Sequence, residues 1–183
     1  MSERLIIQQC SPTLAGLKTG NLFTAPCPSK TELQKDLRKL NQILVPRGLR
    51  ILPLRYAKKR VLLYLYRPDR LRKDLEDAAA WKLLQGKGYP CGQPEHCLAC
   101  LRQRLKDEET FPHEIGLFLG YPPEDVQGFI ENKAGCCKCA GCWKVYGDVK
   151  RAQKTFHQFR NCTRNYCARW AQGATIEQLT VTG

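Results

Sequence analysis

The stretch LRILPLRYAKKRVLLYLY, residues 49–66, decides the fold class that this chain predicts. Residues 49–56 and 61–66 are rich in leucine and tyrosine, and the polar turn Ala57-Lys58-Lys59-Arg60 separates them. Two such runs on either side of a short polar turn indicate a hairpin of two strands. The second run is apolar at every position, which is typical of a central strand that is covered on both faces.

Toward the N-terminus, the sequence predicts a strand at residues 21–24 and a helix after it. The helix begins with the capping box Ser29-Lys30-Thr31-Glu32, and its leucines keep one face until Pro46 and Gly48 stop the run. Those leucines are Leu33, Leu37, Leu40 and Leu44. A shorter helix at residues 13–18 is expected before this strand, with Ser11 as its N-cap and Pro12 in its first position.

Toward the C-terminus, Pro68-Asp69 starts a helix that is expected to reach about Leu84. Residues 21–85 therefore follow a β-α-β-β-α order, which lacks one strand of a ferredoxin-like unit. Residues 142–146 are the best candidate for that strand, and a helix at residues 149–171 follows them. We expect an α+β, ferredoxin-like β-α-β-β-α…β-α arrangement in a single domain, residues 1–183, with a helical insertion at about residues 90–135 before the last strand.

Composition points to a chain that works in a reducing compartment. The 183 residues include eleven cysteines, and no apolar run approaches the ~20 residues that span a bilayer. The first residues lack the apolar core of a signal peptide, because Gln8 and Gln9 interrupt it. We therefore expect a cytoplasmic protein without a membrane segment, whose thiols serve metal binding or redox chemistry rather than disulfides.

The net charge of +13 is unevenly distributed. Residues 47–73 hold ten Lys and Arg against one acid, whereas residues 74–131 hold five against eleven. A basic stretch of this kind can bind nucleic acid or phosphorylated ligands. The stretch lacks interleaved aromatic residues and a nucleic-acid motif, so a solvated surface is favoured and specific nucleic-acid binding is not expected.

Four cysteines fall within residues 136–142, and Cys136, Cys139 and Cys142 have the spacing Cys-x2-Cys-x2-Cys. One tight loop can aim three such thiolates at an iron–sulfur cluster, with Cys162, Cys167 or Cys100 as the fourth ligand. Alternatively, Cys139 and Cys142 can pair with Cys97 and Cys100 in a four-thiolate zinc site, for which His96 and Cys91 are substitutes. The structural alternative is that these cysteines are small buried residues.

Three further groups of residues are candidates for a site. His113 and Glu114 follow Pro112 and could act as a general acid and base, or fill polar niches. Cys10 precedes the expected helix that holds Thr13 and Lys18, so the helix dipole could activate its thiol unless it is simply buried. Lys144 and Tyr146 share one face of a strand, which could contact a phosphate or a flavin-like ring, while Trp143 lies on the other face.

Four blocks of this sequence resemble the DUF3793 family, proteins of unknown function found mainly in anaerobic Firmicutes. The blocks are CSPTLAGLK at residues 10–18, FPHEIGLFLGYP at 111–122, DVQGFIEN at 125–132 and WKVYG at 143–147. The resemblance covers most of the chain. It implies a cytoplasmic, single-domain protein of an oxygen-avoiding cell, and it implies no assigned activity.

Three functional hypotheses follow from the sequence. The first is an accessory protein that binds zinc, an iron–sulfur cluster or another redox cofactor through cysteine. The second is a small-molecule enzyme whose pocket joins Cys10, His113, Glu114 and Lys144. The third and weakest is a nucleic-acid-binding module that uses residues 47–73.

Overall fold

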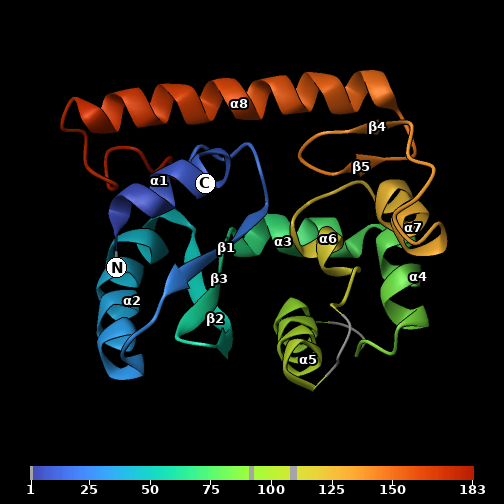
Figure 1. The fold of residues 1–183 in the computed structure, drawn as a ribbon, viewed down its shortest axis with the longest axis horizontal. Helices are drawn as coiled ribbons and strands as arrows, with labels where there is room; N and C mark the ends of the chain where they lie inside the picture. Colours follow the sequence, from blue (N-terminus) through green and yellow to red (C-terminus); the bar gives the residue numbers. More distant parts are fainter. Residues whose placement is uncertain (1, 91–92, 108–110) are drawn as a thin grey trace. The chain divides into compact units, whose positions relative to one another are not determined.

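The computed structural model describes residues 2–90, 93–107 and 111–183, and its elements are labelled in Figure 1. The chain divides into two compact units, which are described separately below. The first unit is Met1–Asp69 with Phe159–Gly183, and the second is Arg70–Gln158. The single domain predicted for residues 1–183 stays a prediction. The mixed α and β content is confirmed.

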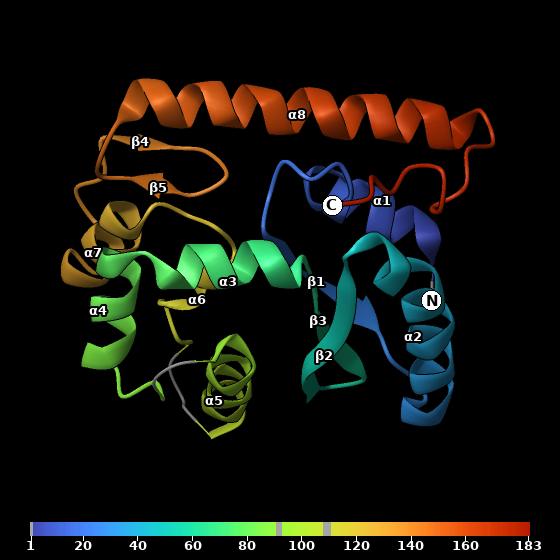
Figure 2. The same ribbon diagram turned by 180° about the vertical axis from the view of Figure 1, so that it is seen from behind.

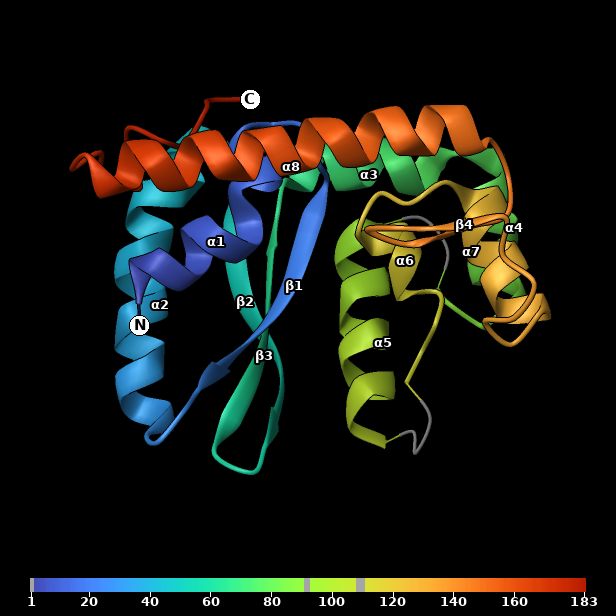
Figure 3. The same ribbon diagram turned by 45° about the horizontal axis from the view of Figure 1, so that its top comes forward.

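The first unit contains a three-stranded antiparallel sheet (Figure 3). Its strands are β1 (Gly20–Pro26), β2 (Arg50–Ala57) and β3 (Arg60–Tyr66), in the order β1-β3-β2. The predicted hairpin is confirmed, and β3 is the central strand as its uninterrupted apolar sequence indicated. The edge strand β2 has an irregular register between Pro53 and Arg55, where proline cannot donate a ladder hydrogen bond.

Helix α2 (Lys30–Leu44) packs its leucine face against this sheet. Ser29 caps the helix by accepting a hydrogen bond from the Glu32 amide at 3.2 Å, as the capping box predicted. The face formed by Leu33, Leu37, Leu40 and Leu44 is buried in one core with residues of β3. The short 3-10 helix η1 (Val45–Arg47) then ends at Gly48, whose φ of 75° is a left-handed conformation that glycine adopts without strain.

The prediction for the first helix is wrong. Helix α1 runs from Glu3 to Leu14, so Ser11 and Pro12 lie in its last turn and not at its start. Ile6, Ile7, Cys10 and Leu14 form a buried stripe, and burial of this apolar face outweighs the local start signal of Ser-Pro. A Schellman motif ends the helix, because the Leu17 amide donates to the Pro12 carbonyl and the Gly16 amide to that of Thr13.

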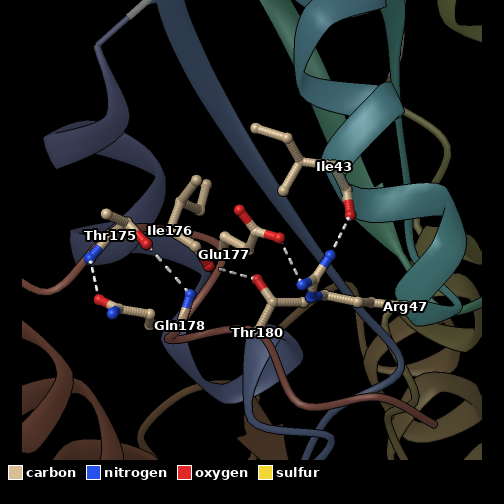
Figure 4. A network of polar contacts seen from close by, with 7 residues as sticks. All are labelled: Ile43, Arg47, Thr175, Ile176, Glu177, Gln178 and Thr180. Carbon is tan, nitrogen blue, oxygen red and sulfur yellow. Dashed lines mark hydrogen bonds and ion pairs between the residues drawn. The ribbon is translucent and has the colours of Figure 1, made fainter.

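Residues near the C-terminus complete the first unit (Figure 4). Thr175 and Gln178 form a reciprocal capping box, in which each backbone amide donates to the other residue's side-chain oxygen. Arg47 connects this turn to α2, because its guanidinium donates to Glu177 at 2.6 Å and to the Ile43 carbonyl at 3.1 Å.

A buried arginine joins three segments of the same unit. Arg67 is 5% exposed and follows β3 directly. Its guanidinium donates to the carbonyls of Thr13 at 2.9 Å, Leu14 at 2.8 Å and Val181 at 2.7 Å. The end of α1 and the C-terminal segment are therefore held by the same charged side chain.

The second unit is mainly helical. Its elements are the greater part of α3 (Pro68–Glu76), α4 (Ala78–Gly86), α5 (Pro94–Asp107), α6 (Ile115–Phe118), α7 (Pro123–Glu131), β4 (Cys139–Ala140), β5 (Lys144–Val145) and the start of α8 (Val149–Ala171). Helices α5, α6 and α7 lie within the range of about 90–135 where a helical insertion was predicted, and the insertion itself stays a prediction. The single helix expected after Pro68 is interrupted at Asp77, whose carboxylate accepts hydrogen bonds from the amides of Ala79 and Ala80 and caps α4. Helix α7 contacts both α4 and β5 (Figure 2).

The predicted last strand does not join the three-stranded sheet. Lys144–Val145 instead pairs with Cys139–Ala140 in a separate two-stranded sheet, so the ferredoxin-like order is not confirmed. The tight turn at Gly141 and Cys142 brings these two short strands together locally. The amides of Tyr146 and Gly147, which could have continued a ladder, donate to the side chain of Asp125.

The long helix α8 agrees with its predicted bounds. Asp148 caps its start by accepting from the Arg151 amide at 3.0 Å, and Gly173 follows its end with a φ of 96°. None of the helices in the described ranges has the length and apolar character that a membrane crossing requires.

Candidate functional site

Asp125 organises the loop around β5 in the second unit. It lies in the first turn of α7 and is 4% exposed. One carboxylate oxygen, Oδ1, accepts hydrogen bonds from the amides of Tyr146 and Gly147, each at 2.7 Å. The other oxygen, Oδ2, accepts the indole N–H of Trp143 at 2.7 Å. Three donors thus fix residues 143–147 relative to α7.

Trp143 is the centre of an aromatic cluster. Its ring stacks on Tyr121 with centroids 4.8 Å apart, and it meets Phe156 of α8 edge-on at 4.5 Å. The Tyr121 hydroxyl donates to the Cys142 carbonyl at 3.2 Å. Burial raises the pKa of Tyr121 to about 12, so this hydroxyl remains a donor at neutral pH.

The cluster forms one wall of a cavity of about 360 Å³. Its other walls come from the segment before α6, from α6 itself and from α7. The lining is mainly aromatic and aliphatic, and its polar members are His113, Asp125 and Lys144. The remaining lining residues are Phe111, Ile115, Gly116, Leu119, Tyr121, Val126, Phe129 and Trp143.

Two glycines allow the close packing around this cavity. A Cβ on Gly116 would lie 2.8 Å from the Val126 side chain, and a Cβ on Gly128 would lie 2.4 Å from the Tyr146 ring. Both distances are below normal van der Waals contact. Helix α7 can therefore approach α6 and the β5 segment only because these two positions lack a side chain.

His113 and Glu114 have different surroundings, although they are adjacent in sequence. His113 is exposed at the cavity and its ring meets Phe129 edge-on at 4.9 Å. Glu114 is 4% exposed and accepts the Tyr89 hydroxyl at 3.0 Å, with Arg104 Nη1 at 3.7 Å. Burial and then the Glu114 charge raise the pKa of Tyr89. Glu114 is thus engaged in a buried network, and His113 alone of the pair faces the cavity.

Lys144 and Tyr146 hold the loop that follows α7. The Lys144 ammonium donates to the Ala134 carbonyl, and the Tyr146 hydroxyl donates to that of Gly135 at 2.9 Å. Lys144 also lines the cavity, where its stem and charge contribute to the wall. Of the sequence-predicted residues in this unit, His113, Trp143 and Lys144 are therefore brought to one cavity.

The predicted metal ligands are distributed over different surroundings. Cys136 and Cys142 are exposed, Cys139 is half-buried on β4, and none of the described cysteines forms a disulfide. Cys97 is 1% exposed on α5, where its thiol donates to the Pro90 carbonyl at 3.5 Å, and Cys100 is half-buried on the same helix. Cys91 lies outside the described residues.

Within the described ranges, no group of three or more His, Cys, Asp or Glu side chains is placed to hold a metal ion. The geometry of these cysteines therefore gives no support to a zinc or iron–sulfur site. Ligation by the residues 136–142 stays a prediction from their spacing alone.

The candidates Cys10, Thr13 and Lys18 belong to the first unit. Cys10 is 0% exposed and lies in the C-terminal half of α1, where the helix dipole disfavours a thiolate. Burial raises the pKa of its thiol, and the Lys18 charge offsets this only in part. The alternative of a buried thiol therefore agrees with the structure, whereas activation at a helix start does not. The Thr13 hydroxyl donates to Asn21 at 2.7 Å, and Lys18 is buried with its ammonium 6.0 Å from the Phe159 ring centroid.

A larger cavity of about 550 Å³ also lies in the second unit. Residues of α3, α4 and α5 line it, among them Arg72, Trp81 and Cys97. Cys97 is the one predicted site residue among its described lining residues. The smaller cavity at Trp143 is the better candidate, because it joins several predicted residues.

Residues 6–180 match the model of the family described as "Protein of unknown function (DUF3793)". The chain belongs to the DUF3793 family. No curated protein and no solved structure matches it. The match to DUF3793 includes every residue that lines the cavity at Trp143.

Sequence reasoning missed Asp125 as a residue of this site. It belongs to the block at residues 125–132, whereas its hydrogen-bond donors belong to the block at 143–147. The signal that could have found it is an acid in a helix's first turn, close to a segment with a tryptophan and two glycines. An acid at such a position usually indicates a helix cap. It does not identify the distant residues that donate hydrogen bonds to the carboxylate.

Proposed function

We propose that the second unit of this DUF3793 protein binds a small planar anion in the cavity at Trp143. The observation that carries the proposal is the joint presence of fixed aromatic walls and two basic groups, His113 and Lys144, around one space. Its volume of about 360 Å³ lies within the range of roughly 300–1,000 Å³ that is usual for small-molecule sites.

The planar shape and the negative charge of the proposed ligand each have a physical reason. Trp143 and Tyr121 offer large apolar faces that favour a flat ring by stacking and burial. Asp125 directs both of its carboxylate oxygens to protein donors, so its charge is already engaged. The cationic Lys144 favours a carboxylate or phosphate substituent on that ring. His113, at the exposed side, can donate to the same substituent.

This proposal keeps part of the small-molecule hypothesis that was drawn from the sequence. Small-molecule binding keeps His113 and Lys144, whereas Glu114 is engaged with Tyr89 and Arg104 and Cys10 is buried in the core of the first unit. Of the three residues that the enzyme hypothesis places in the second unit, His113 and Lys144 line the cavity and Glu114 is not among its described lining residues. Metal or redox-cofactor binding through cysteine stays a separate prediction from sequence.

The test uses 2-naphthoate as a planar anionic probe, with naphthalene-2-methanol as its uncharged analogue. We expect calorimetric titration to detect 2-naphthoate binding, and His113→Ala or Lys144→Met to weaken it at least about fivefold (~1 kcal/mol) without a lower melting temperature for His113→Ala. Leu119→Trp fills the cavity and should abolish binding.

Trp81→Leu is the matched control, because Trp81 lines the larger cavity. The proposal is wrong if Trp81→Leu removes binding while Leu119→Trp does not, or if neither probe binds to the wild-type protein. Equal affinity for the charged and uncharged probes would overturn the assigned role of Lys144.

A further inference from the structure

Helix α8 presents a continuous basic surface that the proposed ligand site does not use. Its 23 residues include six Lys and Arg and no acid. All six are exposed: Lys150, Arg151, Lys154, Arg160, Arg164 and Arg169. Within the described part of the chain, none of the six forms an ion pair with an Asp or Glu side chain. Their charges are thus directed to solvent.

These residues occupy one side of the helix. An α-helix turns by about 100° per residue, so Lys150, Lys154 and Arg164 lie within about 80° of each other around the axis. Arg160 and Arg169 lie on opposite edges of the same exposed face, because nine residues separate them, which is about 180°. The opposite face is buried through Ala152, Phe156, Phe159 and Tyr166. Since α8 is one unbroken helix (Figure 1), the helix alone fixes this spacing.

The spaces between the charges are filled mainly by amides. Gln153, Gln158, Asn161 and Asn165 are exposed on the same face together with His157, and the face carries no exposed Phe, Tyr, Trp or large aliphatic residue. A protein–protein interface needs an apolar centre, which this face lacks. A membrane-bound helix inserts its apolar face, whereas the apolar face of α8 is already packed inside the protein. Charge and hydrogen bonding are the interactions that this surface offers.

We propose that the exposed face of α8 binds the phosphate backbone of double-stranded DNA without sequence specificity. Charge complementarity carries the assignment, because Lys150 to Arg169 spans about 28 Å of helix and duplex DNA carries a negative charge every ~1.7 Å. A helix of about 10–12 Å diameter fits the B-form major groove. The edge of α8 that holds Arg160 then faces one phosphate backbone of the groove, and the edge that holds Arg169 faces the other.

Two features favour duplex DNA over RNA. Single-stranded nucleic acid is bound by aromatic side chains on which bases stack, and the aromatic residues of α8 lie on its buried or half-buried side. The major groove of duplex RNA is deep and narrow, so side chains on a helix do not enter it. The proposal agrees with the expectation that specific nucleic-acid recognition is absent, since phosphates carry no sequence information.

The test measures binding of the whole chain to a fluorescent 20-base-pair DNA of random sequence by anisotropy between 50 and 200 mM salt. The α8 variant is Lys154→Gln/Arg160→Gln/Arg164→Gln. The control variant is Lys35→Gln/Arg38→Gln/Lys39→Gln, which removes three exposed charges from α2. We expect the α8 variant to bind at least about tenfold more weakly, and its log–log salt slope to fall by about two to three, since each phosphate contact contributes ~0.9.

The α2 control should retain most of the affinity and of the slope. Equal losses in the two variants would overturn the proposal, because the effect would then follow from net charge alone. Circular dichroism checks folding, and Lys150→Gln/Lys154→Gln replaces the triple variant if that variant is unfolded.

The same assay separates the alternative partners. We expect poly-glutamate to compete more weakly than unlabelled duplex DNA at equal charge concentration, and equal competition would overturn the nucleic-acid assignment. Tighter binding to a 20-base-pair RNA or to oligo(dT) than to the DNA duplex would overturn the assignment to B-form DNA.

Discussion

The indole N–H of Trp143 donates to Asp125 Oδ2 at 2.7 Å, and this bond joins α7 to the β5 segment. Asp125 is buried and its other oxygen accepts two backbone amides. A carboxylate with three donors supplies acceptors that no neutral side chain of this size can match. The geometry of the cavity therefore depends on Asp125, although Asp125 contributes little surface to the cavity wall.

Asp125→Asn should destabilise the protein and disturb the cavity. The amide keeps one acceptor oxygen, but its NH₂ group then faces donors of the protein, so at least one buried N–H loses its partner. We expect a loss of about 2–4 kcal/mol in the free energy of unfolding, measured with urea. Glu124→Gln is the control, since Glu124 is exposed in the same helical turn and its change should cost less than about 0.5 kcal/mol.

Gly128→Ala should also destabilise the protein, although alanine favours helices over glycine. The new Cβ would lie 2.4 Å from the Tyr146 ring, so the ring and its hydroxyl bond to Gly135 must shift. We expect a cost of about 1–3 kcal/mol from overpacking. Gly86→Ala in α4 is the matched control, because nothing lies within 4 Å of its Cβ position. It should be neutral or stabilising, and the same loss in both variants would contradict the packing argument.

The fold could be predicted where its signals are local. The apolar run of β3, the capping box at Ser29 and the bounds of α8 all follow from residues within one element. The error in α1 arose because Ser11-Pro12 is a strong local start signal. Burial of the stripe from Ile6 to Leu14 outweighed it, and that burial depends on contacts with distant residues of the sheet.

The site could be predicted only in part, for the same reason. Trp143, Lys144 and His113 were found because their side-chain types and positions suggest binding. Their convergence on one cavity depends on Asp125, which lies 18 residues before Trp143. No periodicity or spacing rule connects a carboxylate to one indole and two amides so far along the chain. The pairing of β5 with β4 was missed because a two-residue strand carries almost no pattern.

Tyr121 should make stability depend on pH in the alkaline range. Burial raises its pKa to about 12 in the folded protein, whereas an unfolded tyrosine titrates near pH 10. As the pH rises from 10 to 12, the unfolded state loses this proton while the folded state keeps it, so stability falls by up to about 1.4 kcal/mol per pH unit. Urea unfolding of the wild type and of Tyr121→Phe should differ in this slope, and identical slopes would contradict the assigned pKa.

The cysteine block allows a direct test of the metal hypothesis. If Cys139 and Cys142 are ligands, changing either one to Ser removes bound metal and lowers the melting temperature, since binding energy at a structural site is folding energy. Elemental analysis and an absorbance spectrum of protein purified without oxygen give the metal content. Iron with sulfide identifies a cluster, one zinc identifies a four-thiolate site, and unchanged metal content and melting temperature in both variants reject the hypothesis.

Alkylation should separate the thiols by their burial, independently of any metal. Cys136 and Cys142 are exposed, so in metal-free protein they should react with iodoacetamide within minutes. Cys10 is 0% exposed with a raised pKa and Cys97 is 1% exposed, so both should stay unmodified until the protein unfolds. Mass spectrometry of peptides after timed labelling, with and without urea, gives the order of reaction. Labelling of Cys10 at the rate of Cys136 in the native protein would show that its thiol is not buried in the core of the first unit.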